Sequence, residues 1–493
     1  MFMARGLTIA LCQINLFRYK AIKFDHQSFG LGEDALGQGC AIVADFGKTH
    51  TKLTLWSREG QLLDRVSRAN VPQGAAPYVP LDVAGNSDWL IESLRRFGDH
   101  PVEAIIPVAH GAAVTGIHDG APAFAPPDYE WPIPDHELAA YRAGRDRFAV
   151  TGSPAFPSGL NIGSQLHYLE TLDPSLFRAA TLLPYAQYWA WILSGVAVSE
   201  VTSLGCHSDL WHPASSDFSP MARRRGWAQQ FAPLAKAGDV IGNLRPDLAA
   251  LTGLSPNVRI HAGLHDSNAA LVAARGFVEM GGHEATVLST GTWFVAMRTP
   301  AEPVDLTALP EARDCLVNVD VDGNAVPSAR WMGGREIALL DARIDVPGLF
   351  GLAEVLASGS MVLPSLVQGS GPFPDANHRW MNEPSVATER AAAVALYAAL
   401  MADSQLGLIG AKEHLLIEGR FARSEIFTRA LASLRPEARI YVANAEADVS
   451  FGALRLIWND LRPKSPLQTI EPLPHDLAAY GREWQARAAE QGR

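Results

Sequence analysis

Cysteine is scarce in this sequence, and its placement excludes two kinds of site. Only four cysteines occur among 493 residues: Cys12, Cys40, Cys206 and Cys315. No two of them form a Cys-x-x-Cys pair, so the sequence predicts neither a disulfide framework nor a zinc site. Widely spaced thiols of this kind suit a reducing compartment, and we therefore expect a cytoplasmic protein.

Positive charge is also in short supply. The 41 lysine and arginine residues are outnumbered by 52 aspartate and glutamate residues, which gives a net charge of −11. This balance argues against nucleic acid, or an anionic membrane surface, as a main partner. The sequence also has no run of about 18 apolar residues, so it predicts no membrane span.

What the chain does have is length and apolar content. Its 493 residues are 48% hydrophobic, enough for about two to three domains with sizeable cores. The first 39 residues carry less information, because Gly6–Cys12 faintly resembles a signal peptide while Gln13 and Asn15 interrupt the apolar region. We interpret residues 1–39 as an atypical leader, or as the product of an upstream translation start, without chemistry.

The stretch Val258–Ala274 places an acid between a strand and a helix. A short apolar run turns at Gly263, and the helix-forming residues 269–274 follow. Asp266 lies at this junction, between His265 and Ser267. A carboxylate there can reach into a cleft and act as a general base. The alternative is that Asp266 or Ser267 only caps the helix.

Two strand–turn–strand segments, one in each half of the chain, carry small polar residues in their turns. In Ala41–Trp56 the turn follows Asp45 and contains Gly47, Lys48 and Thr49; in Ala285–Met297 it contains Ser289, Thr290, Gly291 and Thr292. The first is not a Walker A loop, because Ile42 occupies the required glycine position and a strand follows instead of a helix. Such turns can still hold phosphate through amides, hydroxyls and a cation, or can be ordinary polar hairpins.

Further candidates for ligand contacts follow the first hairpin. Helix 87–97 and buried strand 103–109 lead to His110-Gly111, where the histidine is either packed in the core or a hydroxyl ligand. The proline-rich loop 119–134 contains Asp128, Tyr129, Glu130 and Trp131. Aromatic and acidic residues together suit sugar recognition, although a plain surface loop has the same composition.

The remaining pattern alternates helices and strands. We expect helices at 164–171, 185–193, 387–408 and 424–434, strands at 198–204, 414–417 and 439–443, and a last long helix from Ser450. The turn Glu418-Gly419-Arg420 follows one of these strands. A proline-rich segment at 462–474 ends the fold, and residues 476–493 form a helical, exposed tail.

Four of these segments, in this order and spacing, resemble the FGGY family of carbohydrate kinases. They are Asp45–Lys52, Gly263–Ala270, Ser289–Trp293 and Leu415–Gly419, and the resemblance covers Ala41 to Leu461. It implies an α/β fold of two actin-like, ribonuclease-H-like ATPase domains around a central cleft. We place an N-terminal, mainly sugar-binding domain at 40–257 and a C-terminal domain with the base and the nucleotide site at 258–475.

The resemblance also implies a role for each matching residue. Asp266 is the base that deprotonates the sugar hydroxyl, and Asp45 orients Mg²⁺ through water. The nucleotide, ATP, contacts Gly47, Lys48, Thr49, His50, Lys52, Gly291, Thr292, Gly419, Arg420 and Ser424. The sugar contacts His110, Gly111, Tyr129, Glu130, His265 and Ser267. Phosphoryl transfer needs positioning and charge neutralisation more than covalent catalysis, so this set is chemically coherent.

Substrate and nucleotide preference stay open at this point. Trp293 after the second turn and His265 before Asp266 are similar to the rhamnulose and fuculose kinases, which implies a ketose phosphorylated at O1. His110-Gly111 is similar to the pentulose kinases and implies a pentulose. The usual glycine of the family's adenosine turn is Arg420 here, and its usual asparagine is Ser424. A different nucleotide preference is therefore compatible with this pattern.

Three further expectations concern the whole chain. Two phosphate turns in separate halves can contact one nucleotide only if the halves approach, so we expect closure about hinges near 255–262 and 380–415. We expect a small-molecule sugar as partner, neither nucleic acid nor membrane, and leave a homodimer open. A catalytically silent sugar and nucleotide sensor, or another kinase on the actin-like fold, is the rival interpretation.

Overall fold

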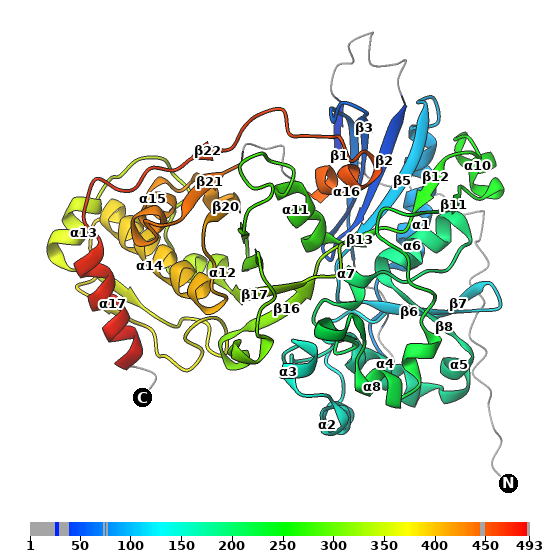
Figure 1. Cartoon of the computed structure of the whole chain (residues 1–493), viewed down its shortest axis with the longest axis horizontal. Coiled ribbons are helices and arrows are strands. Elements are labelled where there is room, and N and C mark those ends of the chain that lie inside the picture. The colour runs from blue at the N-terminus through cyan, green and yellow to red at the C-terminus, as the bar shows by residue number, and fades with distance from the viewer. Residues whose placement is uncertain (1–24, 29–38, 72–73, 75–76, 444–448, 491–493) are drawn as a thin grey trace.

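A computed structural model of the chain describes residues 25–28, 39–71, 74, 77–443 and 449–490. These residues form two α/β bodies, each built on one large sheet (Figure 1). Most of the predicted leader, residues 1–24 and 29–38, lies outside the described residues. Residues 25–28 of that segment form strand β1, which pairs antiparallel with β4 at one edge of the first sheet.

The first body is organised around an eight-stranded sheet. Its order is β1-β4-β3-β2-β5-β12-β11, and β13 also pairs with β5. The strands, in sheet order, are β1 (Asp25–Ser28), β4 (Leu62–Ala69), β3 (His50–Ser57), β2 (Cys40–Phe46), β5 (Val102–Ala109), β12 (Arg259–His261), β11 (Val240–Asn243) and β13 (Leu264–His265).

Both faces of this sheet are covered, and the alternation of side chains on β2 shows how. Ile42 and Ala44 face a core formed with helices α1 (Val83–Arg96), α6 (Tyr185–Ser194) and α10 (Pro246–Thr252). Ala41 and Val43 face the opposite core, formed with α11 (Asp266–Ala274) and α16 (Val449–Ile457). A strand buried on both faces reads as a continuous apolar run, as Cys40–Ala44 does.

A cap of small elements extends the first body beyond the end of β5. A three-stranded sheet, β7-β6-β8, forms part of it. The strands are β6 (Val114–His118), β7 (Ala121–Phe124), β8 (Thr181–Pro184), β9 (Trp211–His212) and β10 (Asp217–Phe218), and the helices are α2 (Asp135–Gly144), α3 (Phe148–Thr151), α4 (Ile162–Leu172), α5 (Pro174–Ala179), α7 (Val201–Leu204), α8 (Pro220–Arg224) and α9 (Trp227–Gln230).

The second body repeats the central topology of the first. Its sheet order is β16-β17-β15-β14-β20-β21-β22. In both sheets a hairpin (β2–β3, or β14–β15) is followed by two parallel neighbours (β5 and β12, or β20 and β21). The strands are β16 (Cys315–Val319), β17 (Ala325–Trp331), β15 (Phe294–Thr299), β14 (Ala285–Thr290), β20 (His414–Gly419), β21 (Arg439–Val442) and β22 (Gln468–Thr469).

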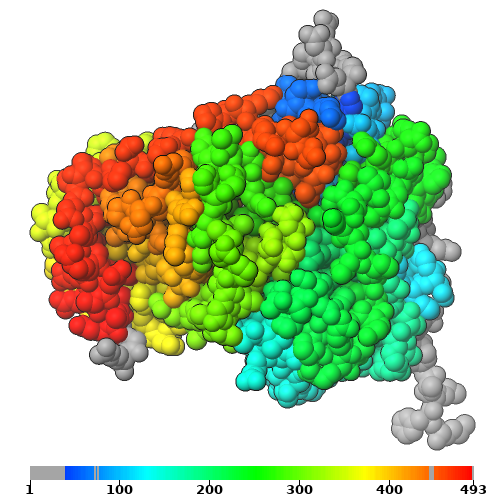
Figure 2. All heavy atoms as spheres, in the orientation of Figure 1, coloured from blue at the N-terminus to red at the C-terminus, as the bar shows by residue number. Residues whose placement is uncertain are grey.

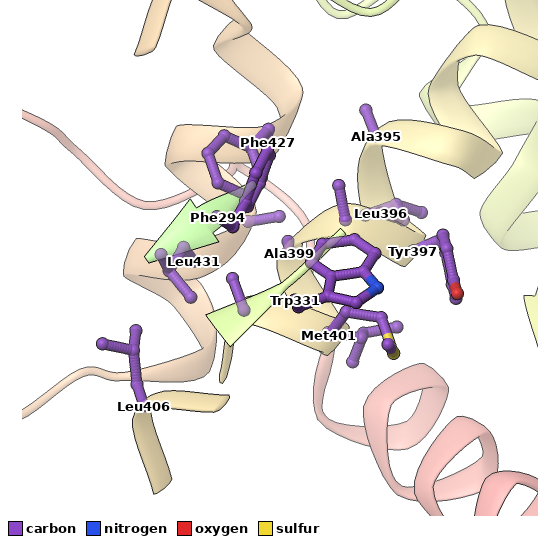
Figure 3. Close-up of a cluster of buried hydrophobic side chains, with 14 of the residues drawn as sticks. Phe294, Trp331, Ala395, Leu396, Tyr397, Ala399, Met401, Leu406, Phe427 and Leu431 are labelled. Carbon is purple, nitrogen blue, oxygen red and sulfur yellow. The ribbon is translucent and has the colours of Figure 1, made fainter. Parts of the chain in front are cut away.

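A long buried helix is central to the core of the second body. This helix, α14, has the predicted bounds, Ala387–Leu408. Phe294 of β15 and Trp331 of β17 pack beside Tyr397 of α14 and Phe427 of the helix at Glu425–Leu434 (Figure 3). Other elements are α12 (Gly333–Leu339), α13 (Leu352–Ser358), α15 (Glu425–Leu434), α17 (Ala478–Glu490), the 3-10 turn η5 (Arg420–Arg423) and hairpin β18 (Met361–Leu363) with β19 (Arg379–Met381).

Helix α14 is also the helix among the described residues that is long and apolar enough to cross a membrane by length and composition. Its most apolar window is 72% buried inside the protein. The helix therefore has the environment of a core element.

Where the two bodies meet, each contributes a side chain to a core of the other. Phe148 of α3 belongs to the core of the second body, and Val319 of β16 belongs to the core of the cap. The backbone N–H of Val317 donates to the carbonyl of Gly152 at 2.8 Å across the same seam. Helix α16, orange-red in Figure 2, lies against the first body and apart from the red C-terminal residues on the far side of the second.

Several sequence predictions differ from this structure. Residues 198–204 are not a strand, because the Glu200 side chain caps the short helix α7. The predicted last long helix ends at Ile457, and α17 follows separately. The tail is helical and largely exposed over its described residues, as predicted, but one face of α17 is buried. Trp484 on this face has an exposed fraction of 0%, and its indole N–H donates to the Val362 carbonyl at 2.7 Å.

The predicted division of the chain between residues 257 and 258 does not follow the sheets. Strands β12 and β13, which come after it in sequence, pair with β5 in the first sheet. Helix α11 packs on the same sheet. The residue predicted to be the base therefore belongs structurally to the first body.

Candidate functional site

Asp266 is the first residue of α11, directly after β13, as the sequence predicts. Its Oδ1 accepts hydrogen bonds from the Ser267 backbone N–H at 2.6 Å and the Ser267 hydroxyl at 3.2 Å. The same oxygen lies 3.1 Å from Nε2 of His265. Burial acts to raise the pKa of Asp266, but the His265 hydrogen bond and charge, with His110 and the Ser267 amide, together lower it. The carboxylate is thus ionised at neutral pH.

His110 follows β5 and lies close enough to Asp266 for the carboxylate charge to act on the pKa of its ring. Its ring lies 5.4 Å from that of Tyr129 and 5.2 Å from that of Tyr185, centroid to centroid. Both ring nitrogens are buried and have no hydrogen-bond partner among the described residues. Burial, the first cause, lowers the pKa of His110 to about 4, so the ring is neutral and offers one donor and one acceptor.

Gly111 allows the loops around His110 to approach closely. A Cβ at this position would collide with Sγ of Cys206 and would lie 2.9 Å from the ring of His265. The predicted sugar contacts His110, Gly111 and His265 are therefore brought together. The requirement for glycine at position 111 is explained by this packing.

The first turn meets the loop that follows β7. Nζ of Lys48 forms an ion pair with Asp128, lies 3.5 Å from Oε2 of Glu130, and lies 4.8 Å from the centroid of the Tyr129 ring. Lys48, predicted to bind nucleotide, thus contacts residues predicted to bind sugar. A pocket beside this contact is lined by Gly47, Lys48, Asn70, Val71, Leu81, Asp82, Asn86, His110, Asp128 and Tyr185.

Several of these lining residues were not identified from the sequence. Asn70 donates to the carbonyls of Gly47 and Lys48 from the end of β4, and Asn86 of α1 accepts from Thr51. Asp128 was noticed only as part of an acidic and aromatic loop. No local pattern marks Asn70, Asn86 or Tyr185, because each reaches the turn through the fold.

Asp45 is near the end of β2 and faces Lys52 of β3 in the register of the hairpin. Oδ2 of Asp45 lies 3.8 Å from Nζ of Lys52, and the Asp45 side chain is 14% exposed. Thr49 and His50 at the tip of the turn are exposed. Carboxylate oxygen is the donor type that Mg²⁺ prefers, so Asp45 fits the ion that the resemblance implies.

The second turn is bonded to the end of β20. The Thr290 hydroxyl donates to the Glu418 carbonyl at 2.6 Å and accepts from the Phe421 N–H at 3.1 Å. Gly419 has φ of +86°, and a Cβ there would collide with the Thr290 carbonyl. Gly291 and Thr292 are exposed in the turn. The residues predicted to bind phosphate and those predicted to bind adenosine therefore lie at the same edge of the second sheet, where strands β14 and β20 end.

A pocket of 1120 Å³ opens at this edge. Gly419 and Arg420 contribute to its lining, together with residues of α15, β21 and β22. Nε of Arg420 donates to Oδ2 of Asp345 at 3.1 Å, so the residue that departs from the family pattern is held by a carboxylate. Ser424 is buried and does not line the pocket; its hydroxyl has no partner among the described residues.

Arg330, which no sequence pattern marks, connects the second turn to the first body. Its guanidinium carbon lies 4.6 Å from the Trp293 ring centroid and 3.9 Å from that of Phe156. Two nitrogens of Arg330 donate to Oδ1 of Asp314 at 3.0 and 2.9 Å. Trp293 is thus held at the seam between the bodies by a cation–π contact.

One cluster of possible metal ligands exists among the described residues: His283, Glu413 and His414. It lies at the opposite end of β14 and β20 from the turns, since Ala285 pairs with His414 and Thr290 with Gly419. The two imidazoles stack at 4.5 Å with an angle of 17° between their planes. The ligand atoms lie within 4.8 Å of one another, but stacked rings hold their in-plane lone pairs in two nearly parallel planes, which is unfavourable for binding one ion.

Residues 282–466 match the family described as carbohydrate kinase FGGY, C-terminal domain. A carbohydrate kinase from Novosphingobium aromaticivorans of known crystal structure is 55% identical, with a TM-score of 0.90 over 92% of this chain and 99% of that one. A xylulose kinase from Lactobacillus acidophilus shares the fold, at 14% identity and a TM-score of 0.71 over 92% and 97%.

Among curated proteins, an L-fuculokinase from Salmonella typhi is 28% identical over 328 residues, or 60% of this chain. The match spans 64% of the length of that relative. Two sheets of one topology, hairpin turns at matching positions, and a 55% identical carbohydrate kinase along nearly its whole length agree with one another. The chain belongs to the FGGY family of carbohydrate kinases.

Proposed function

We propose that this chain transfers the γ-phosphoryl group of ATP to a hydroxyl of a sugar, O1 of a ketose such as L-rhamnulose or L-fuculose. The observation that carries the proposal is the ionised carboxylate of Asp266 beside the neutral, unpartnered ring of His110. A base and a hydroxyl ligand side by side form a site for a sugar hydroxyl that loses its proton.

Each group then has a chemical task. Asp266 takes the proton of the attacking hydroxyl while His265 holds the carboxylate in place. His110, Tyr129 and Glu130 contact the sugar, with Gly111 and Ser267 at its edge. Gly47, Thr49, His50 and Lys52 of the first turn, and Gly291 and Thr292 of the second, contact the phosphates. Gly419 and Arg420 lie on the adenosine side, whereas Ser424 is buried and does not line that pocket.

Asp45 is the residue that would hold Mg²⁺, which neutralises phosphate charge in reactions of this kind. Lys48 is already paired with Asp128, so its charge reaches the nucleotide only after that pair opens or is shared. ATP as co-substrate and the scattered cysteines both favour action in the cytoplasm.

The role of Asp266 is tested by Asp266→Asn, which keeps the shape of the side chain and removes the base. We expect kcat to fall by about 10²–10⁴-fold, the usual contribution of a general base. Sugar binding, measured by calorimetry, should stay close to that of the unchanged protein. Near-normal turnover in this variant would exclude Asp266 as the base.

The substrate is tested by comparing kcat/KM in a coupled ADP-release assay. L-rhamnulose and L-fuculose are compared with D-xylulose, L- and D-ribulose and glycerol. Similarity to an L-fuculokinase and the aromatic surface near the site favour a deoxyketose, whose buried methyl group contributes about 1 kcal/mol. Hydroxyl stereochemistry discriminates more strongly, because a wrong epimer leaves buried groups unpaired.

A pentulose is the second candidate, favoured by His110-Gly111 at the end of β5. If a pentulose or a polyol exceeds the deoxyketoses by tenfold or more, the deoxyketose assignment is wrong and the kinase assignment stands. If none of these compounds releases ADP while sugar and nucleotide still bind by calorimetry, the alternative of a sugar and nucleotide sensor on the same fold is favoured.

A further inference from the structure

We propose that Thr202, held by the buried carboxylate of Glu200, is a positioning residue for the base. Through one hydrogen bond it fixes His265, which in turn fixes Asp266. This inference rests on the proposed function in one respect, that Asp266 is the base. It assigns a task to two residues of the cap that no sequence motif marked.

Glu200 is a fully buried carboxylate whose partners all lie on α7. Its exposed fraction is 0%. Oε1 accepts from the Thr202 N–H at 3.0 Å, and Oε2 accepts from the Thr202 hydroxyl at 2.6 Å and from the Ser203 N–H at 3.1 Å. A buried carboxylate with this many donors is held in one orientation.

The orientation of Glu200 determines that of the Thr202 hydroxyl. A hydroxyl has one proton to donate, and that of Thr202 is given to Glu200. The lone pairs of the oxygen are then free to accept, and the backbone N–H of His265 donates to this oxygen at 3.0 Å. This bond joins residues 63 positions apart, from α7 in the cap to the end of β13.

His265 transmits this constraint to the base. It is the last residue of β13 and the residue before α11, so its backbone determines where the helix begins. Nε2 of its ring lies 3.1 Å from Oδ1 of Asp266, and its Nδ1 lies 3.3 Å from the side-chain nitrogen Nδ2 of Asn268. With backbone and ring both held, the carboxylate has little freedom to turn away from the sugar.

A simpler interpretation is that Glu200 only caps α7. Capping requires the Thr202 and Ser203 N–H groups, which do not involve the Thr202 hydroxyl. The hydroxyl bond to His265 lies outside the helix. The two interpretations therefore differ in what happens when only the hydroxyl is removed.

Thr202→Val removes the hydroxyl at constant side-chain shape, and Thr202→Ser is the matched control that keeps it. We expect Thr202→Val to lower kcat at least about tenfold, because displacing a catalytic group by about 1 Å can reduce a rate by 10²-fold. Sugar affinity by calorimetry should change less than about threefold. Thr202→Ser should keep kcat within about threefold of the original value.

Hydrogen exchange supplies a readout that needs no turnover. The His265 amide should exchange faster in Thr202→Val than in Thr202→Ser or the unchanged protein, measured by mass spectrometry on peptides that contain His265. Unchanged exchange and unchanged kcat in Thr202→Val would overturn the inference, as would equal losses in both variants.

The failure of the proposed function has a different signature. If Asp266→Asn keeps its turnover, the role of Asp266 as base is wrong, whatever the Thr202 variants do. If Asp266→Asn loses turnover while Thr202→Val exchanges and reacts like the unchanged protein, only the positioning inference is wrong.

Discussion

Burial has opposite results at neighbouring ionisable residues of the site. At His110 desolvation prevails, and the ring stays neutral with a pKa of about 4. At Asp266 desolvation is outweighed by His265, His110 and a backbone amide, and the carboxylate stays charged with a lowered pKa. A charged acceptor beside a neutral donor and acceptor suits a hydroxyl, which both gives and receives hydrogen bonds.

Glu200 provides a test of this electrostatic description. Burial is the largest cause and raises its pKa from 4.5 to about 7, although the Thr202 and Ser203 bonds oppose the change. Between these values the folded state holds more protons than the unfolded state, so this group lowers stability as pH rises from 4.5 to 7. Glu200→Gln removes the titration. Relative to the unchanged protein, the free energy of unfolding of Glu200→Gln should increase by up to about 3 kcal/mol as the pH rises from 4 to 8.

Urea unfolding followed by tryptophan fluorescence, at several pH values in that interval, measures this difference. His265 and Cys206 adjoin Glu200, and both are unchanged in the variant. Parallel pH profiles for the two proteins would contradict the raised pKa.

Asp45 is the residue that we propose to bind Mg²⁺. An acid beside a phosphate turn repels the nucleotide unless a cation lies between them. We expect Asp45→Ala to lower activity and to raise the Mg²⁺ concentration needed for half-maximal rate. The measurement is the initial rate across a magnesium titration at fixed ATP. A titration curve of unchanged midpoint would remove Asp45 from the metal site.

At the scale of elements, the strongest local patterns were predicted correctly. The hairpins β2–β3 and β14–β15 were recognised because apolar alternation and small turn residues lie within a few positions of each other. The bounds of α14 were right because its alanine-rich run is long. Asp266 was placed correctly because the change from strand to helix is itself visible in the sequence.

Elements whose environment is set by distant residues were predicted less well. The sequence predicts a strand at 198–204 where helix α7 lies, since no local pattern shows the bond from His265 to Thr202. The sequence predicts an exposed helical tail, whereas Tyr480 and Trp484 give α17 one buried face. In the site, the turns were found from sequence while their partners Asn70, Asn86 and Arg330 were not, because three-dimensional contact brings them there.

The buried face of α17 leads to a stability prediction. Trp484 packs in the core of the second body and donates to Val362 at 2.7 Å. Trp484→Ala should lower the free energy of unfolding by about 3–5 kcal/mol, as expected for a large core residue. The neighbouring exposed residue Gln485, changed to Ala, is the control and should alter stability by less than about 0.5 kcal/mol. Equal effects of the two changes, in thermal or urea unfolding, would mean that α17 does not contribute to the core.

At the scale of the molecule, closure on substrates stays a prediction, but the structure favours hinges at positions other than the predicted 255–262 and 380–415. Residues 259–261 form β12 within the first sheet, and 387–408 and 414–419 form α14 and β20 within the second body. Among the crossings that the structure describes in full, the chain passes between the bodies at 276–282 and 458–467, which are better hinge candidates because they lie outside regular strands and helices.

Small-angle scattering tests closure directly. We expect the radius of gyration to fall when sugar and a non-hydrolysable ATP analogue are added together, and less with either alone. The contacts of Phe148 and Val319 across the seam should persist, since both residues are buried. No compaction with both ligands present would argue that the two turns already reach one nucleotide.

The position of α16 affects the order in which the protein can fold during synthesis. This helix covers the face of the first sheet that carries α11, and a Cβ at Gly452 would collide with the Ala269 carbonyl, so the two helices are in direct contact. Yet about 180 residues separate them in the chain. At 5–20 residues per second the ribosome needs roughly 10–40 s to make that stretch. During this interval Ala41, Val43 and Ile106 have the cover of α11 but lack that of α16, so the nascent first body exposes apolar surface until residue 457 has emerged.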